Sequence, residues 1–86
     1  MAVSRDTVKG EVNNVLASVS GMHIDPDEHQ NLQNDLLLTA PLIGGLAVRW
    51  TRLSESHGGE AVSREEAGET ETVKDCIDLV FGKVEP

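Results

Sequence analysis

The sequence predicts an all-α fold, a small bundle of three main helices and one short helix, with a long loop after the first helix. Three observations support this prediction. Apolar residues recur at helical spacing in three separate stretches. Residues that favour the beginnings and ends of helices flank these stretches. The length of 86 residues, 38% of them hydrophobic, fits one domain whose helices share a core.

The first helix is expected over residues 5–19. Ser4 or Asp6 can accept hydrogen bonds from the free amides at its start, and Gly21 is a natural stop. The apolar stripe that would face the core consists of Val8, Val12, Val15, Leu16 and Val19.

Helical periodicity is lost from residue 20 to residue 34, which predicts the long loop. A turn is expected at residues 25–27, where a proline stands between two aspartates. The isolated apolar residues Met22, Ile24 and Leu32 would pin this loop to the core. A loop this long in so small a domain is usually functional or packed by its own side chains.

The second helix is expected over residues 41–55. Thr39 is its candidate N-cap, and Pro41 would sit in the first turn, where a missing N–H costs nothing. Gly44 and Gly45 each weaken the helix by about 1 kcal/mol, and they allow either a tight helix crossing or the close approach of a ligand or partner. The stripe consists of Leu42, Ile43, Leu46, Trp50 and Leu53.

Two further helices are expected after a flexible break at residues 57–59. A short acidic helix over residues 64–69 would be capped by Ser63. The last helix, residues 73–81, would begin with a capping box of Thr72 and Asp75 and end at Gly82. Its buried face would consist of Val73, Cys76, Ile77, Val80 and Phe81.

Charge and composition exclude several classes of function. The chain has 15 acidic and 7 basic residues, a net charge of −8, which argues against a nucleic-acid binder. Its longest apolar stretch is too short to span a bilayer, so no membrane span is expected. A cytoplasmic location is the default expectation, and we expect a monomer. The lone Cys76 is expected to be a buried, inert thiol. No metal site and no enzyme constellation is expected, and the solvated histidines would be His23, His29 and His57.

Three stretches together resemble the acyl carrier protein family. Residues 62–67 (Val-Ser-Arg-Glu-Glu-Ala) and 72–80 (Thr-Val-Lys-Asp-Cys-Ile-Asp-Leu-Val) are similar, without a gap, to the family's third-helix and fourth-helix pattern. Asp35 and Leu36 resemble the Asp-Leu pair that precedes the family's Asp-Ser-Leu motif. The opening amphipathic helix and the loop after it also match. The resemblance implies an acyl-carrier-like four-helix bundle that covers residues 1–86 as one domain.

The attachment position departs from the family pattern. The family's serine, which takes the 4′-phosphopantetheine arm, falls on Ala40, with Thr39 in place of the aspartate and Pro41 in place of the leucine. Alanine has no nucleophile, so this chain cannot be charged there, whereas a form with serine at this position would hold the arm. Two explanations stay open. Ala40 replaces a native serine, or the protein has lost the arm and uses the fold to bind partners.

The resemblance implies a non-catalytic carrier of a fatty-acid or polyketide-type pathway, with synthase or acyltransferase enzymes and a phosphopantetheinyl transferase as partners. The alternative is a carrier-like interaction module without a prosthetic group that docks to or regulates a synthase. Residues 36–54 contain no acidic residue, unlike the family's acidic docking helix, so apolar contacts would guide the partner. The expected partner-binding residues are Asp35, Leu36, Thr39, Pro41, Leu42, Ile43 and Arg49.

The run Leu36-Leu37-Leu38 has two interpretations. These side chains could shape the mouth of a cleft that shelters an acyl chain or a partner side chain. They could instead anchor the loop to the core. We expect at least two of the three to be anchors.

Overall fold

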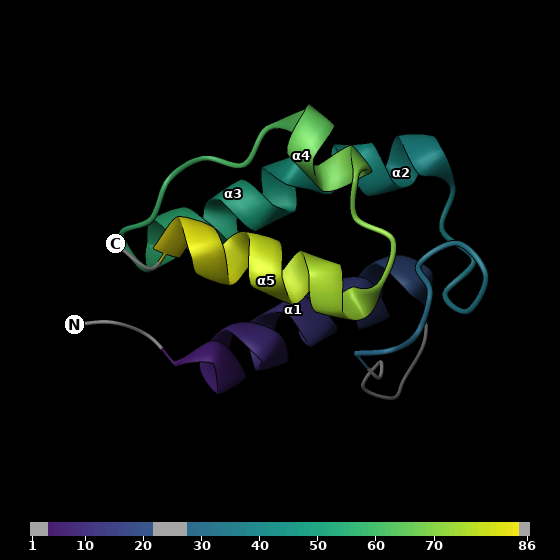
Figure 1. The fold of residues 1–86 in the computed structure, drawn as a ribbon, viewed down its shortest axis with the longest axis horizontal. Helices are drawn as coiled ribbons and strands as arrows, with labels where there is room; N and C mark the ends of the chain where they lie inside the picture. The colour runs from purple at the N-terminus through teal and green to yellow at the C-terminus, as the bar shows by residue number, and fades with distance from the viewer. Residues whose placement is uncertain (1–3, 22–27, 85–86) are drawn as a thin grey trace.

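The computed structural model describes residues 4–21 and 28–84, and these residues form an all-α fold (Figure 1). The prediction of a small helical domain is therefore confirmed at this level. The helices are α1 (Arg5–Ser20), α2 (Ala40–Gly45), α3 (Ala47–Ser56), α4 (Arg64–Gly68) and α5 (Val73–Val84). The β-structure within the described ranges amounts to one isolated bridge between Asn31 and Thr72.

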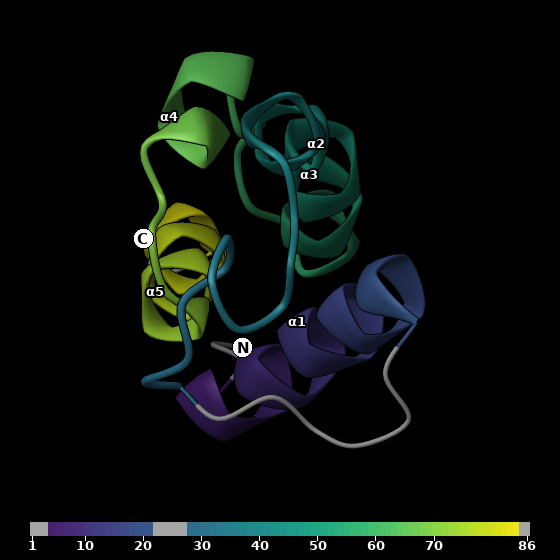
Figure 2. The same ribbon diagram turned by 90° about the vertical axis from the view of Figure 1, so that its right-hand side faces the viewer.

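The three longest helices enclose the core. α3 and α5 run in the same direction, and α1 runs the opposite way beneath them (Figure 1). Seen from the end of the molecule, α1 crosses the other two obliquely (Figure 2). The short helices α2 and α4 pack against each other near the amino end of α3. The fully buried side chains include Leu16 of α1, Trp50 of α3 and Ile77 of α5, so all three long helices contribute to one core.

The ends of α1 follow the sequence signals. Ser4 is the N-cap, and its Oγ accepts a hydrogen bond from the amide of Thr7 at 3.2 Å. Gly21 ends the helix in the left-handed conformation, with φ at 77°, which a glycine adopts without a steric penalty. Val8, Val12 and Leu16 are buried. The prediction for this helix is confirmed to within one residue.

The predicted continuous helix over residues 41–55 is wrong in one respect, because the structure divides it at Leu46. The amide of Leu46 donates to the carbonyls of both Leu42 (3.1 Å) and Ile43 (3.2 Å), which marks a tightened turn. The preceding Gly44 and Gly45 lower helix propensity at this point. Gly44 also lies against α4: a Cβ added to it would lie 3.5 Å from Cγ of Arg64. Gly44 is thus buried at a helix crossing, the first of the two interpretations, although a Cβ there would make only ordinary van der Waals contact with Arg64.

Both predicted N-caps of the last two helices are present. Ser63 Oγ accepts from the amide of Glu66 (3.1 Å), and Glu66 Oε1 accepts from the amide of Ser63 (3.2 Å). At α5, Thr72 Oγ1 accepts from the amide of Asp75 (3.3 Å), and Asp75 Oδ2 accepts from the amide of Thr72 (3.2 Å). Each reciprocal pair satisfies two helix-end donors that would otherwise lack a partner.

The predicted end of α5 at Gly82 is wrong, because the helix continues to Val84. Contacts from distant segments hold its last turn. The carbonyl of Lys83 accepts a hydrogen bond from the amide of Glu60 at 3.1 Å. The ammonium of Lys83 lies 2.8 Å from Oε2 of Glu66 on α4.

The turn at residues 57–59, predicted as a flexible break, is packed closely against the end of α5. The amide of Gly59 donates to the carbonyl of Ser54 at 2.8 Å. A Cβ added to Gly59 would lie 2.5 Å from the carbonyl oxygen of Lys83 and 2.8 Å from Cα of Val84. A residue without a side chain is therefore required where this turn meets the helix.

The second part of the long loop is docked on the amino end of α5. The carbonyls of Gln30 and Glu28 accept from the amides of Val73 (3.1 Å) and Lys74 (2.9 Å), and Leu32 is fully buried. The predicted anchors Met22 and Ile24, and the turn at residues 25–27, lie outside the described residues. The guanidinium of Arg5 adds ion pairs from α1 to Glu28 and to Asp78 of α5.

Candidate functional site

Residue 40 lies where the resemblance requires it, at the exposed amino end of a helix. Ala40 is the first residue of α2, and Thr39, in extended conformation, is its N-cap. Pro41 occupies the first turn, as expected. The side chain of Thr39 makes no capping hydrogen bond, and Thr39, Ala40 and Pro41 are all exposed. The start of α2 is therefore open to approach from solvent.

The leucine run before α2 separates into two anchors and one exposed residue. Leu36 and Leu38 are buried, at 3% and 4% exposure, whereas Leu37 is 79% exposed. This confirms the prediction that at least two of the three anchor the loop. Leu37 has φ at 60°, a left-handed conformation that a leucine rarely adopts. The reversal at Leu37 lets both flanking leucines point into the core.

The structure removes two residues from the expected partner-binding set. Leu36 is a core anchor, and Ile43, at 2% exposure, packs inward beside Gly44 where α2 meets α4. Ile43 is therefore no surface contact, and the prediction that it guides a partner is wrong. Leu42, at 40% exposure, remains accessible, as does Arg49.

Asp35 has a local structural partner. Its Oδ2 accepts a hydrogen bond from the backbone amide of Asn31 at 2.6 Å. The amide of Asp35 in turn donates to the carbonyl of Asn31 at 2.9 Å. Asp35 is exposed, but its carboxylate closes the turn that leads toward Ala40.

Four exposed residues on α3 and α4 form a surface that we call the arginine face: Val48, Arg49, Arg52 and Arg64. Arg49 and Arg52 are one helical turn apart on α3, and Arg52 and Arg64 line one groove together. Within the described ranges, none of these three guanidiniums lies in a salt bridge, whereas Arg5, Lys9 and Lys83 each pair with a carboxylate. Sequence reasoning found the lack of acidic residues in 36–54 but missed Arg64, because only the crossing of α2 and α4 brings it here.

The groove beside the arginine face is open and mostly apolar. It has a volume of about 450 Å³. Ala47, Val48 and Val62 form its apolar part, and Thr51 hydrogen-bonds the backbone of Val62 through its hydroxyl (2.9 and 3.1 Å). Its charged edges are Arg52, Glu55 and Arg64.

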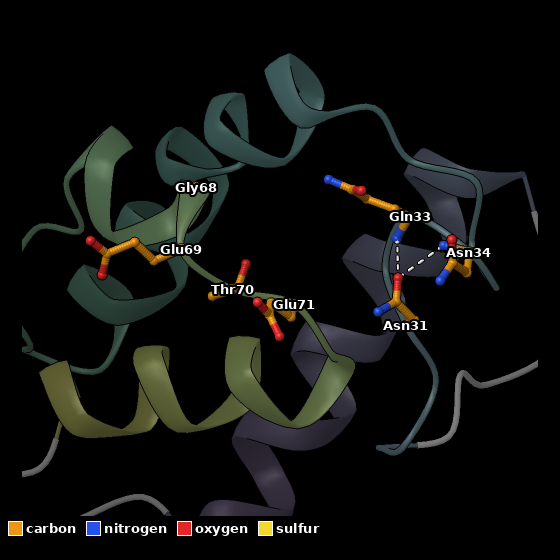
Figure 3. A pocket seen from close by; sticks show the side chains of 7 residues that line it. All are labelled: Asn31, Gln33, Asn34, Gly68, Glu69, Thr70 and Glu71. Atoms are coloured by element: carbon orange, nitrogen blue, oxygen red, sulfur yellow. Dashed lines mark hydrogen bonds between the residues drawn. The ribbon is translucent and has the colours of Figure 1, made fainter.

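A second hollow, of about 520 Å³, lies between the loop before α2 and the connection from α4 to α5 (Figure 3). Its lining is polar: Asn31, Gln33, Asn34, Gly68, Glu69, Thr70 and Glu71. The side-chain oxygen of Asn31 accepts from the backbone amides of Gln33 and Asn34, both at 2.9 Å, as the dashed lines in Figure 3 show. Part of this polar lining therefore serves the loop itself. No pattern in the sequence pointed to this hollow.

Cys76 and His57 have structural roles. Cys76 is fully buried, and burial raises the pKa of its thiol to about 12, which confirms the prediction of an inert thiol. The prediction of a solvated His57 is wrong, because the turn after α3 places its Nε2 2.5 Å from Oε1 of Glu11 on α1. His29 is exposed, and His23 lies outside the described residues. Residues 4–21 and 28–84 contain no group of three or more His, Cys, Asp or Glu side chains that could hold a metal ion.

The side chain at position 40 does not fit the prosthetic group that the resemblance implies. A phosphodiester to 4′-phosphopantetheine needs a hydroxyl oxygen, and Ala40 offers a methyl group. The adjacent hydroxyl belongs to Thr39, one residue before the family's attachment position. Position 40 therefore offers no nucleophile to which such an arm could be joined.

No known protein family, curated protein or solved structure matches this chain. Across the part of the chain that the structure describes, no helix combines the length and the apolar character needed to cross a membrane.

Proposed function

We propose that this chain is a non-catalytic carrier domain of the acyl-carrier-protein kind, from a fatty-acid or polyketide-type pathway, with alanine at the attachment position. The observation that carries the proposal is the placement of Ala40, which is exposed at the amino end of α2 and follows a turn closed by Asp35. Two N-capped helices, α4 and α5, are formed by the stretches that resemble the family's third and fourth helices, which supports the proposal. Their capping boxes support the register of the resemblance.

On this proposal, the chain lacks only the hydroxyl oxygen at position 40 that would attach the 4′-phosphopantetheine arm. With serine at position 40, a phosphopantetheinyl transferase would attach the arm, and synthase or acyltransferase enzymes would be the partners. A flexible tether raises the local concentration of a bound acyl group at each partner enzyme. Because Ala40 is exposed, adding a hydroxyl there requires no rearrangement of the core.

The test is to incubate Ala40→Ser with coenzyme A and a phosphopantetheinyl transferase and to measure the intact mass. We expect Ala40→Ser to gain the mass of one arm and the unsubstituted chain to gain none. The matched control is Gly45→Ser, which adds a hydroxyl to the same helix at an exposed position with no atom within 4 Å of the new Cβ. Modification of Gly45→Ser as well, or no modification of Ala40→Ser, would contradict the proposal.

Thr39 needs a separate control because its hydroxyl is exposed and one residue away. Should the unsubstituted chain gain the arm, the experiment is repeated with Thr39→Ala. Loss of the added mass would move the attachment position to Thr39. We expect no such gain, because a shift of one residue aims the arm in a different direction.

A second candidate function is an interaction module that uses the same fold without a prosthetic group. The observation that favours it is Ala40 itself, which has no nucleophile. An Ala40→Ser variant that folds normally and is never modified would support the module over the carrier.

A further inference from the structure

We infer that the arginine face docks an acidic, amphipathic segment of a partner protein. The inference goes beyond the carrier proposal and does not depend on it, since none of the residues involved is the attachment position. It rests on the distribution of charge, on the distribution of exposed apolar side chains, and on the groove between α3 and α4.

The charge distribution isolates the arginine face from the rest of the molecule. All 15 acidic residues of the chain lie outside residues 36–54, and Arg49 and Arg52 lie inside them. Arg64 joins them from α4, and none of the three arginines forms a salt bridge with a described residue. In a chain of net charge −8, three guanidiniums that pair with no carboxylate of residues 4–21 or 28–84 are candidates to bind an external anion.

The exposed large apolar side chains lie in the same stretch of sequence as Arg49 and Arg52, and Val48 lines the groove with Arg52 and Arg64. Among the described residues, the large hydrophobic side chains classed as exposed are Leu37 (79%), Leu42 (40%) and Val48 (62%), all before or within α2 and α3. Between Leu42 and Val48 in the sequence, Gly45 has no side chain, and open space surrounds the position that its Cβ would occupy. This combination of apolar and basic side chains matches a partner that carries both apolar residues and carboxylates.

The lining of the groove indicates where the apolar and the acidic side chains of such a partner would bind. An apolar side chain seated over Ala47, Val48 and Val62 would have Arg52 and Arg64 beside it. Their planar guanidiniums suit bidentate hydrogen bonds to carboxylates. Glu55, one helical turn after Arg52, also lines the groove and repels a carboxylate beside it. The partner's carboxylates are therefore expected at the three arginines and not beside Glu55.

Other anions fit less well. Nucleic acids and anionic membranes are extended polyanions, which the net charge of −8 repels at long range. A second copy of this chain offers acidic residues in α4 and α5, but it brings the same net charge. A local acidic segment with an apolar anchor avoids most of this repulsion.

The test is a binding titration monitored by backbone amide shifts in NMR. The probe is a synthetic peptide with leucines at helical spacing and glutamates between them. A second peptide has lysine at every glutamate. We expect the glutamate peptide to bind more tightly, to shift the amides of α2, α3 and the start of α4, and to lose affinity as ionic strength rises.

The matched variants are Arg49→Glu, Arg52→Glu and Lys74→Glu. All three replace an exposed basic residue and change the net charge equally, but Lys74 lies on α5, outside the arginine face. We expect each arginine variant to weaken binding by about five- to tenfold and Lys74→Glu to weaken it by less than about twofold. Circular dichroism checks that each variant is folded.

Several results would overturn the inference. These are equal binding of the lysine peptide, no binding of the glutamate peptide, shifts confined to another surface, or equal effects of all three variants. Tighter binding of a short DNA duplex or of phosphatidylserine vesicles, lost in the arginine variants, would assign the face to a polyanion. Concentration-dependent dimers that shift the same amides would assign it to a second copy.

Discussion

Replacing Gly59 by alanine should destabilise the protein, because two segments meet there with no room for a side chain. The added Cβ would lie 2.5 Å from the carbonyl oxygen of Lys83 and 2.8 Å from Cα of Val84, and both contacts are to backbone atoms. The turn cannot move away freely, since the amides of Gly59 and Glu60 bond to the carbonyls of Ser54 (2.8 Å) and Lys83 (3.1 Å).

We expect Gly59→Ala to lower the free energy of unfolding by about 1–3 kcal/mol, the usual cost of forcing extra volume into a packed site. For a domain of this size, each kcal/mol lowers Tm by roughly 4–8 °C. The control is Gly10→Ala in α1, where nothing lies within 4 Å of the new Cβ. That change should raise the free energy of unfolding by about 0.5–1 kcal/mol, because alanine favours a helix more than glycine does.

The assay is urea unfolding followed by the fluorescence of Trp50, the only tryptophan, whose side chain is fully buried. The two variants should shift the midpoint in opposite directions with similar slopes. If Gly59→Ala were as stable as the unsubstituted protein, the turn would not be packed on α5 as described.

Two further predictions use the same measurement. Leu37→Gly should leave the free energy of unfolding unchanged or raise it by up to about 1.5 kcal/mol. It relieves about 1–2 kcal/mol of left-handed strain, and the greater freedom of glycine in the unfolded chain costs about 0.5–1 kcal/mol. Leu38→Ala should instead cost about 2–5 kcal/mol, because Leu38 is buried; similar losses from both changes would argue against the reversal at Leu37. The hydrogen bonds from Lys83 and from the amide of Ser63 hold the pKa of Glu66 below its ordinary value of 4.5. The ionised Glu66 therefore adds to the free energy of unfolding above about pH 4.5, and this stabilisation is lost as the pH falls further. In Glu66→Gln, the free energy of unfolding should fall less steeply between about pH 5 and pH 3. An unchanged pH dependence would contradict this role.

Sequence patterns predicted those parts of the fold that depend on local signals. The stripe of Val8, Val12 and Leu16 and the capping residues Ser4 and Ser63 act within one or two helical turns, and the structure has them as expected. The division at Leu46 was predictable only in part. The two glycines indicate low helix propensity, but the packing of α2 on α4 is a tertiary contact that the local sequence does not specify.

The sequence predictions were wrong where contacts between distant segments determine the structure. Gly82 resembles a helix stop, yet α5 continues because Glu60 and Glu66 hold Lys83 in the last turn. In the candidate site, the helix start at Ala40 followed from local signals, the N-cap Thr39 and Pro41 in the first turn. Whether Leu42 or Ile43 faces solvent depends on how α2 lies on α4, and a helical stripe cannot specify that.

The docking of the loop on α5 has a consequence for the order of folding. The carbonyl of Glu28 accepts a hydrogen bond from the amide of Lys74, and that of Gln30 accepts one from the amide of Val73; about half of the chain lies between the two members of each pair. Closing so large a segment costs entropy that local helix formation does not. This junction therefore forms late on the folding path, and changes that weaken it should act mainly by accelerating unfolding.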